Sequence, residues 1–207
     1  MIAAASVAVF SIVYGSVLLA GLLTLPSPAA QIQEPWFSLM EVLIILIAPS
    51  MVAFTSAIHA SAAEQDQSMA LAAVAFMSMC SGVTCVVHFA TLTLGHHPAI
   101  AAQSWARLVF SFQWPSVAYA LDILAWDIFF PLGALLAAST IHGAGRARAA
   151  RRVMFASAAL AFCGLAGVPL GNMQVRNLGI IGYALLFPVS AALMAMVFRR
   201  SALQNEV

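Results

Sequence analysis

The sequence predicts an all-α, polytopic membrane protein: a bundle of six transmembrane helices, with an outer interfacial amphipathic helix between helices 3 and 4. Two properties of its composition indicate this class. Of the 207 residues, 63% are hydrophobic and 7% are charged, whereas globular proteins have about a quarter charged residues and about half apolar ones. The mean hydropathy is +1.00. We therefore expect the lipid bilayer, and not water, to surround most of the chain.

Six windows are long and apolar enough to cross a bilayer, which requires about 20 mainly apolar residues. They cover residues 2–25, 36–60, 69–94, 117–140, 153–170 and 178–198. The first window is longer than the apolar core of a typical signal peptide and no basic region precedes it, so we interpret it as a span. All six belong to one integral membrane domain, residues 1–207.

Arginines predict the orientation of these spans. Arginine in a short loop is retained in the cytoplasm, and the arginines gather in the fourth connection and after the last span. These residues are Arg146, Arg148, Arg151, Arg152, Arg199 and Arg200. With six spans, both the N-terminus and the C-terminus are then cytoplasmic. The absence of lysine together with abundant alanine is typical of a GC-rich bacterial genome, so we expect a bacterial inner membrane.

The third connection contains the predicted interfacial helix, residues 98–113. Gln103, Arg107 and Ser111 recur every four positions between apolar residues, which is amphipathic helical spacing. Pro98 is placed to begin this helix and Pro115 to end it. The segment has two interpretations: an aromatic anchor at the membrane surface, or a lid over an outward-facing cavity.

Prolines fall near the middle of three spans that run from outside to inside. Pro49, Pro131 and Pro188 each remove a backbone hydrogen bond and kink a helix. They are either hinges or ordinary prolines of membrane helices, in which proline is common.

Ionisable residues inside the spans are the main functional signal, because a charge at the bilayer centre costs at least about 2.5 kcal/mol. Glu41 and Asp122 lie five residues into their helices, and His88 lies about six residues before the end of its helix. At 1.5 Å per residue, each is about 8 Å below the outer surface. The sequence therefore predicts that these three side chains share one polar layer.

Two arginines and a second aspartate complete the candidate site. Arg176, at the outer end of the sixth helix, and Arg107, on the interfacial segment, can reach down to a carboxylate. Asp127 is deeper. It is five residues from Asp122, or about 140° around an α-helix, so we do not expect the two aspartates to form a same-face pair. The predicted substrate-binding or proton-coupling residues are Glu41, His88, Asp122, Asp127, Arg176 and Arg107.

Other kinds of chemistry have weak or no support. A formal charge of +1 and the absence of lysine argue against nucleic-acid binding and against a Schiff-base cofactor. Cys85 and His88 lie on one helical face and are weak candidates for metal ligands, but no paired-ligand motif accompanies them. We therefore predict neither a cofactor nor a metal.

Glycines at near-helical spacing occur in the fifth and sixth spans. They predict close helix packing and leave room for self-association as a homo-oligomer. These residues are Gly164, Gly167, Gly171, Gly179 and Gly182.

Three hypotheses of function remain. The first is a small transporter or binding protein for a small solute or ion, coupled to a proton; it predicts a cavity that reaches Asp127. The second is an accessory or scaffold subunit; it predicts that every acid is paired and that no cavity exists. The third is an intramembrane enzyme that acts on a lipid headgroup; it predicts a pocket or metal joining His88 to Asp122.

Overall fold

The computed structural model describes residues 1–27, 30 and 32–204, and this part of the chain is helical without any strand. The long helices are α1 (Ile2–Leu23), α2 (Trp36–Ala60), α3 (Gln67–Ala90), α7 (Phe130–Ser139), α8 (Arg146–Leu165) and α10 (Phe187–Gln204). The shorter elements are η1 (Glu64–Asp66), η2 (Thr91–Gly95), α4 (Pro98–Ala101), α5 (Ala106–Phe110), α6 (Val117–Ile123), η3 (Leu124–Phe129), α9 (Asn177–Ile180) and η4 (Ile181–Leu186).

Within the described residues, five helical stretches are long and apolar enough to cross a membrane. They are Ile2–Leu23, Trp36–Ala60, Glu64–Gly95, Val117–Ser139 and Asn177–Leu203. The fourth is formed by α6, η3 and α7 without a break, and the fifth by α9, η4 and α10. These stretches correspond to five of the six predicted spans, so the sequence located them to within a few residues at most ends.

The fifth predicted span, residues 153–170, differs from the structure. Helix α8 begins earlier, at Arg146, and ends at Leu165, so that four arginines occupy its first two turns and residues 166–170 form turns. These arginines are why α8 falls outside the five apolar stretches. Hydropathy alone could not show that the helix continues through them.

The segment predicted as one interfacial helix, residues 98–113, is also different. It forms two short helices, α4 and α5, separated by turns at residues 102–105. A single continuous helix is therefore wrong for this segment. Gln103 and Ser104 fall in the break, and such polar side chains favour turns over helix interiors.

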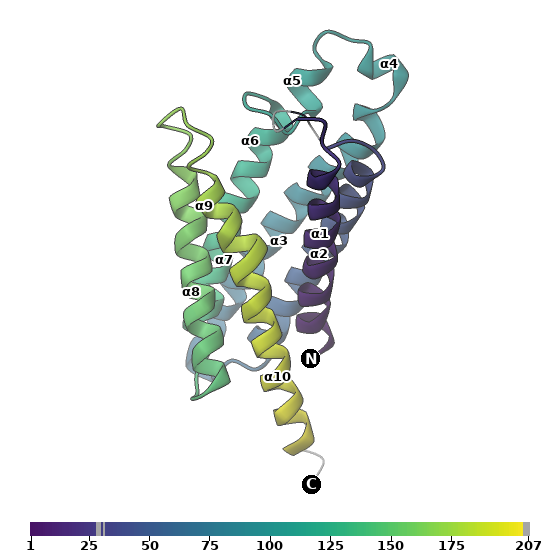
Figure 1. Ribbon diagram of the computed structural model, residues 1–207. Coiled ribbons are helices and arrows are strands. Elements are labelled where there is room, and N and C mark those ends of the chain that lie inside the picture. The colour runs from purple at the N-terminus through teal and green to yellow at the C-terminus, as the bar shows by residue number, and fades with distance from the viewer. Residues whose placement is uncertain (28–29, 31, 205–207) are drawn as a thin grey trace.

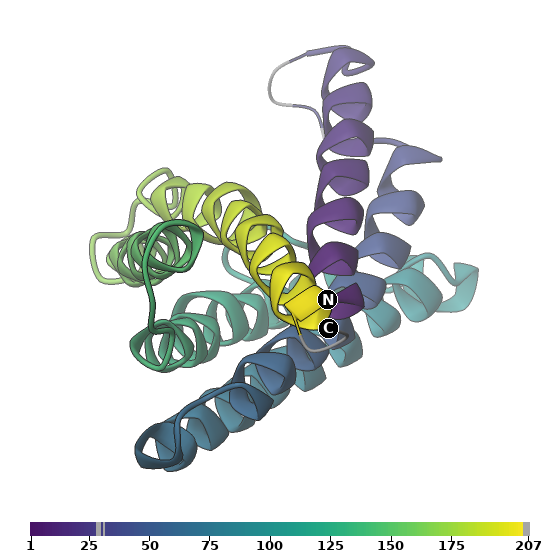
Figure 2. The same ribbon diagram turned by 90° about the horizontal axis from the view of Figure 1, so that it is seen from below.

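The long helices pack in a ring, in which each contacts the next along the chain and α10 returns to α1. Figure 1 shows both termini at one end of the bundle and α4 and α5 at the other, and Figure 2 shows the ring from the end with the termini. We call these the terminal end and the α4–α5 end.

Three aromatic rings fill the middle of the ring of helices. Phe54, Phe130 and Phe187 are fully buried, and the ring of Phe187 lies 5.7 Å from that of Phe54 and 5.0 Å from that of Phe130. Large apolar side chains such as Ile12 and Val86 are exposed instead, each at 68%. An apolar outer surface around a tightly packed interior is what a bilayer requires.

Two of the three mid-span prolines come shortly after a turn of π-helix. The π-helix η3 ends two residues before Pro131, and η4 ends two residues before Pro188. Proline cannot donate the i→i−4 hydrogen bond, and a wider turn accommodates the carbonyl that loses its partner. Pro49 lies inside α2 without such a turn.

The glycines of the fifth and sixth spans pack α8 against α9 and η4. A Cβ on Gly164 would lie 3.0 Å from the Cα of Gly179, and a Cβ on Gly182 would lie 2.5 Å from the carbonyl oxygen of Ser157. The Ser157 hydroxyl donates to the carbonyl of Gly182 at 2.8 Å. Gly164, Gly179 and Gly182 are thus occupied by contacts within the chain. Gly167 and Gly171 lie in the turns after α8 and not in the helix, and a Cβ on Gly171 would meet nothing within 4 Å.

We predict that Gly182→Ala destabilises the bundle by about 1–3 kcal/mol, because its methyl group has no room against α8. Gly82→Ala is the matched control: a Cβ there meets nothing within 4 Å, and the substitution should leave stability unchanged or raise it by up to about 1 kcal/mol. Thermal unfolding of both variants in detergent measures this. Equal stability of Gly182→Ala and the native protein would contradict the close α8–η4 contact.

Candidate functional site

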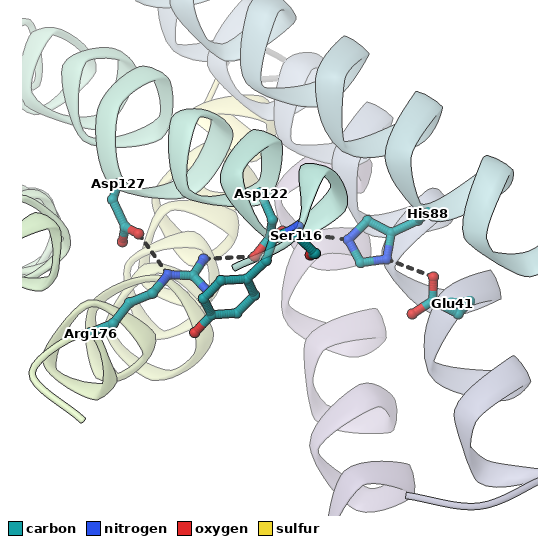
Figure 3. Close-up of polar contacts among 7 residues, drawn as sticks. Glu41, His88, Ser116, Asp122, Asp127 and Arg176 are labelled. Atoms are coloured by element: carbon teal, nitrogen blue, oxygen red, sulfur yellow. Dashed lines mark hydrogen bonds and ion pairs between the residues drawn. The ribbon is translucent and has the colours of Figure 1, made fainter. Parts of the chain in front are cut away.

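Five ionisable side chains form a continuous row across the interior of the bundle (Figure 3). In order, the row contains Glu41 of α2, His88 of α3, Asp122 of α6, Arg176 at the start of α9, and Asp127 of η3. We call these five residues the buried charge row. It contains five of the six residues predicted from the sequence.

The first half of the row is centred on His88. Its Nδ1 lies 2.9 Å from Oε2 of Glu41, and its Nε2 lies 3.6 Å from Oδ1 of Asp122. The second distance exceeds a hydrogen bond, and Nε2 has no hydrogen-bond partner among the described residues. The three residues predicted to share one layer are therefore neighbours, and the row is least tightly connected between His88 and Asp122.

The second half is a guanidinium shared by two carboxylates. Nη2 of Arg176 donates to Asp122 at 2.6 Å, and its Nε donates to Asp127 at 2.8 Å. The prediction that these aspartates lie on different faces is wrong. It assumed an α-helix throughout, but between Asp122 and Asp127 the chain passes from α6 into the π-helix η3, whose i→i+5 hydrogen bonds turn the chain less per residue and bring the two side chains toward one face.

Asp127 is the most deeply enclosed member of the row, with no exposed surface. Its Oδ1 has no hydrogen-bond partner among the described residues. A Cβ on Gly179 would lie 2.8 Å from this oxygen, so glycine at this position leaves the space that the carboxylate occupies. The free energy of burying Asp127 is recovered mainly through Arg176.

Aromatic rings cover the row, and the sequence did not indicate them. The guanidinium carbon of Arg176 lies 4.5 Å from the ring centroid of Tyr119, and the ring of Phe112 stacks on His88 at 4.8 Å. Ser116 caps α6 by accepting from the backbone N–H of Tyr119 at 3.1 Å. The spacing of Tyr119 and Asp122, three residues apart on α6, is the only sequence signal that could have linked Tyr119 to the site.

A cavity of about 740 Å³ lies beside the row, and residues of α4 and α5, among them Ala101 and Arg107, line it at the α4–α5 end of the bundle. Glu41, His88, Asp122 and Arg176 line it, whereas Asp127 does not. Residues 110–113 contribute to its wall, which places part of the predicted interfacial segment over the cavity. This volume is within the range of small-molecule sites, about 300–1,000 Å³.

Two other predicted residues have different surroundings. Arg107 lines the cavity from α5 but is exposed and makes no ion pair with the described residues. The thiol of Cys85 donates weakly to the carbonyl of Ile45, at 3.9 Å. In the described part of the chain, no three His, Cys, Asp or Glu side chains gather as metal ligands.

The charges of the row do not balance. Three carboxylates face one guanidinium, and His88 is the only other ionisable member. Burial alone lowers the pKa of Arg176, but Asp122 and Asp127 outweigh burial and hold that pKa above its usual value. Arg176 therefore stays charged, and neutralising the row requires two more positive charges, carried by protons or by a bound cation.

No family model, curated protein or solved structure matches the chain.

We predict that Arg176→Met lowers the stability of the protein by about 3–5 kcal/mol, because it leaves the buried carboxylate of Asp127 and the partly buried one of Asp122 without their cation. Adding Asp127→Asn to this variant should restore part of the loss. Arg107→Met is the control and should change stability by no more than about 0.5 kcal/mol, because Arg107 is exposed. Thermal unfolding in detergent compares the three, and equal losses for Arg176→Met and Arg107→Met would contradict the pairing.

Proposed function

We propose that this protein binds a small solute or ion in an outward-facing polar cavity of the membrane and couples its binding or transport to protonation of the buried charge row. The single observation that carries the proposal is the excess of carboxylates over cations beside a cavity of about 740 Å³. Such an excess is expensive in a low-dielectric interior. It favours a site that holds exchangeable protons.

The geometry supports proton exchange at the half of the row nearest the cavity. Glu41, His88 and Asp122 line the cavity, so protons can reach them from the α4–α5 end. The guanidinium of Arg176 binds both aspartates, which ties the protonation of Asp122 to the position of Arg176 at the start of α9. Binding of a charged solute at Asp122 would change the same contacts.

Scaffolding is the second candidate, and one observation favours it: every carboxylate of the row has an ion-pair partner. A cavity that stops short of Asp127 also differs from the cavity expected of a transporter. We nevertheless favour solute binding, because a scaffold needs no cavity of this size. The cavity is lined by both His88 and Asp122, so it is also compatible with an intramembrane enzyme that acts on a lipid headgroup. No other feature of the described residues supports that enzyme.

For topology, we propose six crossings, with α8 as the fifth in chain order. Its 20 residues are about 30 Å long at 1.5 Å per residue, enough to cross the hydrocarbon core. Its arginines lie at the terminal end, where they can extend toward water. Both termini and these arginines would then be cytoplasmic in a bacterial inner membrane, and α4 and α5 would lie at the outer interface.

Proton coupling is tested in proteoliposomes that contain a pH-sensitive dye. Small cationic, neutral and anionic solutes are added outside, one at a time. We expect at least one to change the internal pH with the native protein, and Asp122→Asn to abolish that change, because it removes the carboxylate shared by His88 and Arg176.

The control for this assay is Glu64→Gln, which removes an exposed carboxylate on η1 and should leave the signal intact. A pH signal that Asp122→Asn does not alter would refute coupling through the row. No signal with any solute would favour the scaffold.

Cysteine labelling tests the crossing by α8. In a protein whose Cys80, Cys85 and Cys163 are replaced by alanine, Asn172→Cys should react with a membrane-impermeant maleimide on intact cells. Ala144→Cys, at the other end of α8, should react only after the membrane is opened. Reaction of both cysteines from the same side would show that α8 does not cross.

A further inference from the structure

The cavity beside the buried charge row combines two features that select one chemical class of ligand. Carboxylates, among them Glu41 and Asp122, line it together with aromatic rings from several helices. We infer that the ligand is an organic cation, an ammonium with an aromatic or apolar body, that exchanges with a proton held by Glu41, His88 and Asp122. This inference rests on the proposed function and names the substrate class of the same site.

The aromatic walls are suited to positive charge. Three rings that line the cavity already contact groups that are cationic or can become cationic. Tyr119 contacts Arg176, and Phe112 stacks on His88. The ring of Phe37 lies 5.2 Å from the ring of His96. The face of an aromatic ring attracts a cation, and the attraction is stronger when water is excluded. The same walls offer apolar surface for the body of an organic ligand.

Two further rings stand beside the carboxylates. Trp126 and Tyr183 lie 4.9 Å apart, and both line the cavity together with Tyr14 and Asp122. An ammonium group placed near Asp122 would therefore meet a carboxylate in a cavity that aromatic rings also line. Such an aromatic site recognises alkylated ammonium groups.

An anionic ligand is disfavoured by the state of the arginines. Arg176 already binds two carboxylates and the ring of Tyr119. Arg107 is exposed on α5, where water and salt screen its charge. An anion entering the cavity would add charge of the same sign as the surplus of the row.

An inorganic cation is disfavoured by the lining. Ions such as Ca²⁺ and Mg²⁺ require six or more oxygen ligands at short distances, and the described residues contain no group of three acidic, His or Cys ligands placed for a metal. The volume of about 740 Å³ suits an organic molecule.

The exchange balances charge without another reactant. When the cation binds, one proton leaves the Glu41, His88 and Asp122 group for water, and the total charge of the row and its contents is unchanged. Cation and proton compete for the same carboxylates. The affinity for the cation should therefore rise as the pH rises.

Isothermal titration calorimetry on the full-length protein in detergent tests this, with benzyltrimethylammonium as the probe. We expect binding at least tenfold tighter at pH 8 than at pH 5. Repeating the titration in buffers of different ionisation enthalpy should show about one proton released per cation bound. Tetramethylammonium, which lacks the aromatic body, should bind at least tenfold more weakly, and benzoate should not bind.

Variants assign the effect to residues. Glu41→Gln should weaken benzyltrimethylammonium binding at least tenfold and flatten its pH dependence, whereas Glu64→Gln should leave both unchanged. The pH dependence of benzyltrimethylammonium binding to the native protein requires no variant. It therefore tests the competition between cation and proton even if Glu41→Gln does not fold.

The outcomes also separate the ligand class from the proposed function. Binding of benzoate with proton uptake would overturn the cation class and leave proton-linked binding standing. Binding of benzyltrimethylammonium without any change in bound protons would overturn the exchange. No binding of either probe, with proton flux still present for a neutral solute, would overturn the ligand class alone.

Discussion

The pairing of charges in a low-dielectric interior is the constraint on which the rest of this structure depends. Isolated carboxylates of Glu41, Asp122 and Asp127 would be too costly to bury. Each therefore contacts His88 or Arg176, and these contacts join α2, α3, α6 and the start of α9 at one level. The positions of the helices at the level of the row consequently depend on how the row is ionised. The apolar packing around Phe54 does not depend on ionisation.

The π-helical turns let two such contacts converge. In a regular α-helix, Asp127 would point about 140° away from Asp122, which would turn the two carboxylates away from a shared guanidinium. The wider turn of η3 realigns them, and Gly179 on the facing helix leaves room for the deeper carboxylate. Two of the three π-helical turns of the described residues, η3 and η4, precede a proline in the same span. The residues that interrupt the α-helical ladder thus also shape the site.

Hydropathy and the rise per residue were sufficient to predict much of the fold from the sequence. Hydropathy located five apolar stretches, and helix rise placed Glu41, His88 and Asp122 in one layer because it converts residue count into depth. The alignment of Asp127 could not be predicted, because a π-helix changes the angle per residue without a clear sequence signal. Tyr119 and Phe112 were also missed, because aromatic residues are common in membrane helices and their partners are distant in the chain.

The three proline-bearing helices also carry the rings that close the bundle. Phe54 lies five residues after Pro49, while Phe130 and Phe187 immediately precede Pro131 and Pro188. Phe130 contacts Trp126 and Tyr183, which line the cavity, so the aromatic packing adjoins the cavity.

A path from the cavity to the terminal end of the bundle would have to separate these aromatic rings. A helix bends most readily where its backbone hydrogen bonds are interrupted. In α2, α7 and α10 the interruption is a proline, and each proline is adjacent or close in sequence to one of the rings that would have to move. Asp127 lies four residues before Pro131, so a bend of the helix at Pro131 would also displace Asp127. Separation of the aromatic rings and the ion pair between Arg176 and Asp127 are therefore coupled through residues 127–131.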